Sequence, residues 1–170
     1  GSGLGGLAAL HFAGKQARLH GIAVHGAIAD SLLQDYDGRT LHRWLDTRAH
    51  YVVRRTDGMQ AQHGDDWKAV VDADTAFLRR IADRGGYRLP DAVLAGIGCP
   101  VLLTGNLRDE ITPGIAEQFA QMSDRISSCS VFLAAESGHR YGDQHPFMHA
   151  APNAFRAAVD AFLEETTQSA

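Results

Sequence analysis

Residues 97–113 read IGCPVLLTGNLRDEITP, and this stretch places a carboxylate directly after an apolar run. PVLLTG (100–105) has the length and composition of a buried strand. Asp109 follows on the loop at the strand's carboxyl end, and Pro113 stands near the start of the next helix. Because open α/β sheets build their sites at this edge, Asp109 is a candidate catalytic acid. The alternative is a carboxylate that only caps the helix.

Strand and helix patterns alternate on both sides of this stretch. GIAVHG (21–26) and CSVFLAA (129–135) predict two further buried strands. Ala27 to about Asp91 is more polar and has helical spacing. Such alternation is typical of a parallel sheet with helices on its faces. Four helices are predicted, at 4–14, 66–84, 111–122 and 152–165.

Composition favours one soluble domain of 170 residues. A formal net charge of −4 gives no reason to expect a nucleic-acid partner. No apolar run approaches the roughly 20 residues of a membrane span, and no signal peptide is visible. Cys99 and Cys129 do not form a disulfide framework and are expected to be reduced. We therefore expect a cytoplasmic protein without a membrane partner.

The first residues, GSGLGG (1–6), fit two fingerprints. One is the G-x-G-x-x-G turn of dinucleotide-binding proteins, which needs an acidic residue about 20 positions later, at the end of the second strand. The predicted strand there ends in His25, and Asp30 lies beyond it. This mismatch argues against a dinucleotide site, so no cofactor is expected.

The other fingerprint is a strand-to-helix elbow of the form G-x-nucleophile-x-G-G, which places Gly3 at the nucleophile position and small residues at Gly1, Gly5 and Gly6. With the acid of 97–113 and the histidines and helix of 129–163, the order elbow, acid, histidine resembles the α/β-hydrolase superfamily. The resemblance implies an α/β fold, the C-terminal part of a hydrolase domain from the elbow onward. Residues 1–170 would form one partial domain, with a small helical cap inserted at about 31–91.

The resemblance also implies a Ser-His-Asp triad in intact relatives, with Asp109 as the acid. Two histidines compete for the role of base. His145 lies seven residues before Pro152, as the family's catalytic histidine commonly does, and is favoured; His139 lies at a suitable distance past the strand. A metal site of His139, His145 and His149 with Asp143 fits no familiar zinc spacing, and none is expected.

Glycine at position 3 has several explanations. The chain could have lost its nucleophile and act as a ligand-binding or interaction module, or Gly3 could be a substitution made to trap a substrate. Ser2 could serve from a shifted turn, but Leu4 would then occupy a position that needs a small residue. Gly1 and Ser2 could also come from cloning. We therefore expect a protein of the esterase or acyl-hydrolase type that, with glycine at position 3, does not carry out covalent catalysis.

The partners implied by the resemblance are a small-molecule ester or related acyl substrate and a covering for the sheet. In the family, the first strands of the sheet precede the elbow. An open sheet edge pairs readily with other chains. We therefore expect an absent N-terminal half, or a second copy, to cover it.

Overall fold

The computed structural model describes residues 1–16, 19–53, 56–135 and 145–168. The chain divides into two compact units. The first combines Gly1–Gln34 with Leu89–Ala170, and the second is Asp35–Arg88. Within the described residues, no helix combines the length and apolar character that a bilayer crossing needs.

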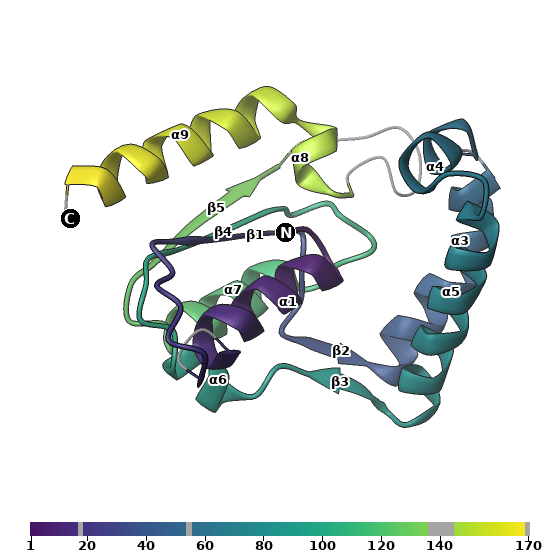
Figure 1. Cartoon of the computed structure of the whole chain (residues 1–170), viewed down its shortest axis with the longest axis horizontal. Coiled ribbons are helices and arrows are strands. Elements are labelled where there is room, and N and C mark those ends of the chain that lie inside the picture. Colours follow the sequence, from purple (N-terminus) through teal and green to yellow (C-terminus); the bar gives the residue numbers. More distant parts are fainter. Residues whose placement is uncertain (17–18, 54–55, 136–144, 169–170) are drawn as a thin grey trace. The chain divides into compact units, whose positions relative to one another are not determined.

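The first unit is built on a parallel sheet with the strand order β1-β4-β5 (Figure 1). The strands are β1 (Ala27–Asp30), β4 (Val101–Asn106) and β5 (Cys129–Ala134). Val101 pairs with Ala27 on one side and Cys129 on the other, so the strands start flush. β4 is buried along its whole length, as its position in the middle requires. The predicted parallel sheet, including the strands at 100–105 and 129–135, is confirmed.

The predicted strand at 21–26 was wrong, because the chain enters the sheet only at Ala27. The residues of β1 that point inward are small, and the strand ends in Asp30, whose side chain is buried. Strands are predicted from apolar runs, and this strand was missed because it is short, rich in alanine and ends in a charged residue. The prediction of helix from Ala27 onward fails here for the same reason.

Helices flank this sheet, including those predicted at 4–14, 111–122 and 152–165. α1 (Leu4–His11) leads into a short π-helical turn at Phe12–Gln16, and α7 (Ile115–Ser123) follows β4. α6 (Asp91–Ala95), α8 (Phe147–Ala150) and α9 (Pro152–Gln168) complete the unit.

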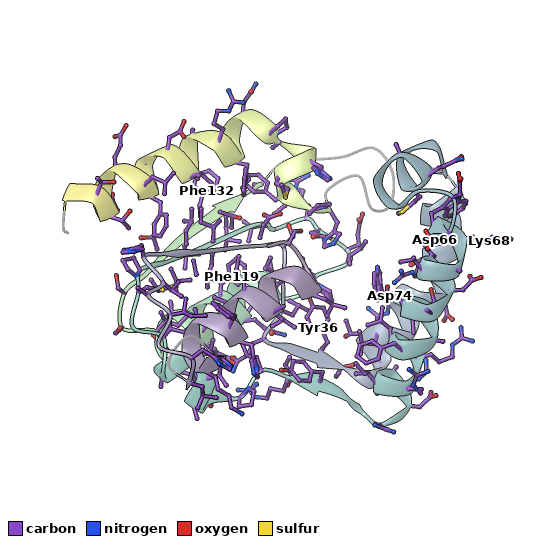
Figure 2. The ribbon with its side chains drawn as sticks, viewed as in Figure 1. Tyr36, Asp66, Lys68, Asp74, Phe119 and Phe132 are labelled. Carbon is purple, nitrogen blue, oxygen red and sulfur yellow. The ribbon has the colours of Figure 1, made fainter. Side chains whose placement is uncertain are left out.

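The core of the first unit gathers side chains from both the sheet and the helices. Phe119 of α7 is fully buried (Figure 2). Phe147 of α8 packs between Phe132 of β5 and Phe155 of α9, at ring-centroid distances of 5.8 and 6.2 Å. This contact ties the segment after His145 to the sheet.

Within the described residues, the second unit consists of a two-stranded antiparallel sheet and three helices. β2 (Asp35–Asp37) pairs antiparallel with β3 (Gly86–Arg88), and the helices are α3 (Gly38–Val53), α4 (Thr56–His63) and α5 (Trp67–Asp83). The sequence predicted α5 and its end before the Gly85–Gly86 pair, but missed the two strands. Gly86 has a φ of 109°, and a Cβ there would collide with the carbonyl oxygen of Tyr36, so this strand pair requires glycine. A role of this unit as a substrate cap stays a prediction.

Candidate active site

The chain turns sharply at Gly3, between a strand-like start and α1. Ser2 forms a parallel bridge with Asp30, and the Asp30 N–H donates a hydrogen bond of 2.9 Å to the Gly1 carbonyl. The Gly3 N–H donates to the Asp30 carbonyl at 2.8 Å, and the helix begins at the next residue. Gly3 itself has φ 54° and ψ −125°, a conformation that costs a side-chain-bearing residue roughly 1–3 kcal/mol. Gly3, and not Ser2, is therefore the apex of a strand-to-helix elbow.

The elbow is tight at two of the three expected positions. A Cβ on Gly1 would collide with the carbonyl oxygen of Gly5, and one on Gly6 would lie 3.2 Å from a methyl of Leu32. A Cβ on Gly5 would meet nothing within 4 Å. The expectation that Gly5 must be small was wrong, because its side-chain position faces open space.

Alanine substitutions at Gly5 and Gly1 are expected to change the free energy of unfolding in opposite directions. Gly5→Ala should raise the free energy of unfolding by about 0.5–1 kcal/mol, because alanine is the better helix former and no neighbour has to move. Gly1→Ala should lower the free energy of unfolding, because backbone atoms have to shift. Urea denaturation of both variants checks this, and equal effects would contradict the geometry of the elbow.

Asp109 follows β4 on a short turn, and its carboxylate is fully buried. Oδ1 accepts a hydrogen bond from the Ile111 N–H at 2.9 Å, and Oδ2 accepts one from the Thr112 hydroxyl at 2.9 Å. Oδ2 also lies 2.8 Å from Nδ1 of His145. The carboxylate therefore ties down its own loop and also holds an imidazole. It does not cap the next helix, α7, whose N-cap residue Gly114 has no side-chain hydrogen bond, so the capping interpretation was wrong.

His145 brings the elbow and the acid together. When Asp109 is ionised, Nδ1–H is the donor, which leaves Nε2 as an acceptor. Nε2 would lie 3.9 Å from a Cβ placed on Gly3. The structure therefore brings Gly3, Asp109 and His145 to one place at the carboxyl end of the sheet. His139 and Asp143 lie outside the described residues.

The end of β1 holds the segment that follows His145, a role the sequence analysis missed. The Phe147 N–H donates to the Ser31 hydroxyl at 2.7 Å, and the Met148 N–H donates to Oδ2 of Asp30 at 3.3 Å. The Thr104 hydroxyl donates to Oδ1 of Asp30 at 2.8 Å. Asp30 and Ser31 thus fix the start of α8 to the sheet. In the sequence these two residues appear only as a polar pair after an apolar run. Because the strand was predicted at 21–26, the pair was not recognised as the end of a strand.

Burial raises the pKa of Asp30 above its ordinary value of 3.8, and the hydrogen bonds from Thr104 and Met148 offset only part of this effect. The folded chain therefore binds this proton more tightly than the unfolded chain. As the pH rises from 3.8 through the folded pKa, the Asp30 contribution to stability becomes less favourable.

We expect Asp30→Asn to remove this component of the pH dependence. Urea denaturation at a series of pH values above 3.8 should show a smaller decline in the free energy of unfolding than in the unaltered chain. The same change at the exposed Asp160 controls for the loss of one charge. Identical slopes for the unaltered chain and Asp30→Asn would contradict this account.

The position of Asp30 also changes the argument about the dinucleotide fingerprint. The strand after α1 does end in an acidic residue, so the reason given from His25 was wrong. However, the Asp30 side chain is only 1% exposed and is engaged by Thr104 and Met148. A carboxylate in this state does not offer its oxygens to ribose hydroxyls.

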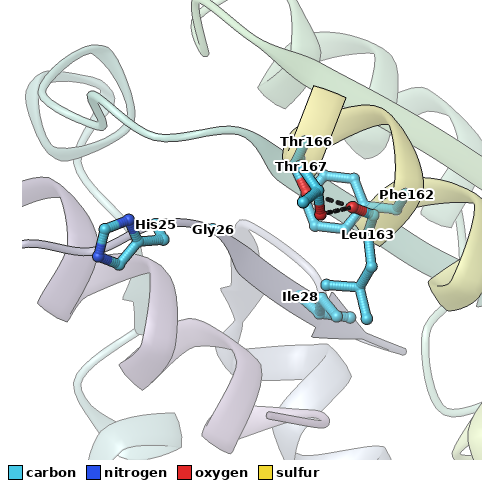
Figure 3. A pocket seen from close by; sticks show the side chains of 7 residues that line it. All are labelled: His25, Gly26, Ile28, Phe162, Leu163, Thr166 and Thr167. Atoms are coloured by element: carbon cyan, nitrogen blue, oxygen red, sulfur yellow. Dashed lines mark hydrogen bonds between the residues drawn. The ribbon is translucent and has the colours of Figure 1, made fainter. Parts of the chain in front are cut away.

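His25 lies at the opposite end of β1 from the elbow, because it precedes the strand. The expectation that a strand ends in His25 was therefore wrong. His25 lines a surface hollow of about 360 Å³ between the start of β1 and α9. Figure 3 shows the side chains that line this hollow. Thr166 and Thr167 on this rim both donate hydrogen bonds to the Leu163 carbonyl within their own helix.

Comparison with solved structures identifies the fold. The chain superposes on NosK from Streptomyces actuosus with a TM-score of 0.67 and 18% identity, over 98% of this chain and 69% of that one. A proline iminopeptidase of Mycobacterium smegmatis gives 0.57 and 17%, over 99% and 65%. CarC, a serine hydrolase involved in carbazole degradation, gives 0.61 and 19%, over 96% and 62%.

These comparisons confirm the α/β-hydrolase fold that the sequence predicted. The chain spans about two thirds of the length of these hydrolase-fold structures. A scan of protein-family models and a search of curated sequences return no match.

Proposed function

We propose that the chain carries an acyl-hydrolase site of the esterase type whose nucleophile position is occupied by Gly3. The observation that supports this most directly is the Asp109–His145 pair, joined at 2.8 Å beside an elbow with the conformation of a nucleophile turn. Structural neighbours described as a serine hydrolase and a proline iminopeptidase agree with this chemistry.

In an intact relative, a serine at position 3 would attack the acyl carbon. His145 would take its proton, and Asp109 would hold the imidazole in the required tautomer and stabilise the imidazolium. The backbone N–H of Leu4, the first residue of α1, is not needed for the helix's own hydrogen bonds. It is thus available to an oxyanion, as the residue after the nucleophile is in this fold.

Because residue 3 is glycine, this chain lacks the nucleophile. The proposal therefore includes the loss of covalent catalysis. Removing the nucleophile of such a triad lowers kcat by about 10⁶-fold, and binding and oxyanion contacts account for what remains. Ser2 is a poor substitute, because its bridge to Asp30 places it in the strand-like segment before the apex.

A second candidate function is a non-catalytic ligand-binding or interaction module with the same site. The observation that favours it is again Gly3, since the rest of the constellation is retained without a nucleophile. In either case the proposed ligand is a small-molecule ester or related acyl compound. An N-terminal half or a second copy remains the proposed covering for the sheet edge.

A fluorophosphonate probe tests the proposed site, since it phosphonylates only an activated nucleophile. The Gly3→Ser variant should be labelled at residue 3, as seen by peptide mass spectrometry, and the unaltered full chain should not. His145→Gln in the Gly3→Ser background is the matched control and should lose the label. A folded Gly3→Ser variant that is not labelled would refute the acyl-hydrolase proposal.

A further inference from the structure

We propose that His145 acts as a general base on a water molecule at the elbow, so that the unaltered chain hydrolyses activated esters without an acyl-enzyme intermediate. This inference rests on the proposed function, because it uses the same histidine and the same substrate class. It assigns an activity to the Gly3 chain itself.

The absence of a side chain at Gly3 leaves the space for this water. Apart from atoms of the adjacent Ser2 and Leu4, the nearest atoms to a Cβ on Gly3 would be Nε2 of His145 at 3.9 Å and the Ser31 carbonyl oxygen at 4.0 Å. A hydroxymethyl group would thus fit here, and a water molecule is of comparable size. The site meets the requirement that a bound water have both room and polar partners.

The two polar neighbours have the right character to orient a water for attack. With Nδ1–H donated to Asp109, Nε2 is an acceptor, and the Ser31 carbonyl is an acceptor as well. A water that donates one hydrogen to each keeps its lone pairs for an acyl carbon above the elbow. Ser31 is held in place, because its N–H donates to the Thr104 carbonyl at 2.8 Å and its hydroxyl accepts from Phe147.

The proposed reaction balances without a further reagent. The water oxygen forms a bond to the ester carbonyl carbon as one of its protons passes to Nε2 of His145. Asp109 stabilises the resulting imidazolium through Nδ1–H. The tetrahedral intermediate then breaks its bond to the alkoxy oxygen, which takes the proton from Nε2. The products are the alcohol and the carboxylic acid, which releases its proton to solvent.

The effect of removing His145 from the Gly3 chain distinguishes water activation from a simple loss of the nucleophile. When triad members act only as a unit, removing the histidine after the nucleophile is already absent costs almost nothing. If His145 activates water, its removal should cost the contribution of a general base, about 10²-fold or more.

The experiment measures p-nitrophenyl acetate hydrolysis by the full chain, by His145→Gln and by Gly3→Ala. Both variants should lower kcat/KM by about 10²-fold, because one removes the base and the other places a methyl group in the water's space. His149→Gln is the matched control, since this exposed histidine of α8 reports unspecific imidazole reactivity, and it should leave the rate unchanged. Progress curves of the unaltered chain should be linear without a burst.

Gly3→Ser measured in parallel separates the two proposals. If it shows a burst of p-nitrophenol while the unaltered chain and His145→Gln are equally slow, the water mechanism is overturned and the proposed function stands. If Gly3→Ser and the unaltered chain are both no faster than His145→Gln, both proposals fail. If thermal melts show that Gly3→Ala is unfolded, the comparison of kcat/KM between His145→Gln and His149→Gln still tests the water mechanism.

Discussion

Gly3→Ser is expected to raise the rate of p-nitrophenyl butyrate hydrolysis by at least about 10³-fold, a conservative part of the roughly 10⁶-fold that a triad nucleophile contributes to kcat. The expectation follows from the elbow, since a Cβ at residue 3 would lie 3.9 Å from Nε2 of His145. From that position a serine hydroxyl can reach the base without movement of the backbone. Stopped-flow measurement should show a burst of p-nitrophenol equal to the amount of enzyme, followed by slower turnover.

The same substitution should lower the free energy of unfolding by roughly 1–3 kcal/mol, because a residue with a Cβ is strained at this backbone conformation. Gly5→Ser is the matched control, as it introduces the same side chain two residues away into open space. It should give neither the burst nor the strain penalty. A gain of activity that disappears with Ser2→Ala would show instead that the turn has shifted and that residue 2 is the nucleophile.

The carboxyl half of the sheet was predictable because its signals are local. β4 begins with the apolar run Val101–Leu103 and is buried along its whole length, and Asp109 follows it at the distance a short loop allows. The N-terminal strand β1 was not predictable in the same way. Its stability depends on hydrogen bonds from distant residues to Asp30, and a single sequence does not display these contacts.

The same distinction applies to the site. The spacing between His145 and Pro152 favoured His145, and the structure places this residue beside Asp109. Spacing could not indicate that Asp30 and Ser31 hold the backbone after His145, because the partners are separated by more than a hundred residues. The resemblance supplied the order of the site residues, whereas the supporting hydrogen bonds became visible only in three dimensions.

Asp109→Asn in the Gly3→Ser background is expected to lower kcat by about 10⁴-fold. An asparagine amide has nearly the same shape as the carboxylate, so its oxygen can still accept from the Ile111 N–H. Its NH₂ group would face His145, however, and would favour the tautomer with the proton on Nε2. In that tautomer the imidazole cannot accept the serine proton. Nitrogen-15 chemical shifts of His145 should therefore change along with the loss of activity.

Thr112→Val in the same background separates orientation of the histidine from support of the loop. This change removes the 2.9 Å hydrogen bond to Oδ2 of Asp109 and leaves the contact with His145 in place. It should cost about 1–3 kcal/mol of stability and less than about tenfold in kcat, because the carboxylate loses one partner but keeps its charge. If Asp109→Asn lowered kcat no more than Thr112→Val, Asp109 would be a loop-capping carboxylate only. A loss that is larger by orders of magnitude, with the tautomer change, would identify it as the residue that orients the base.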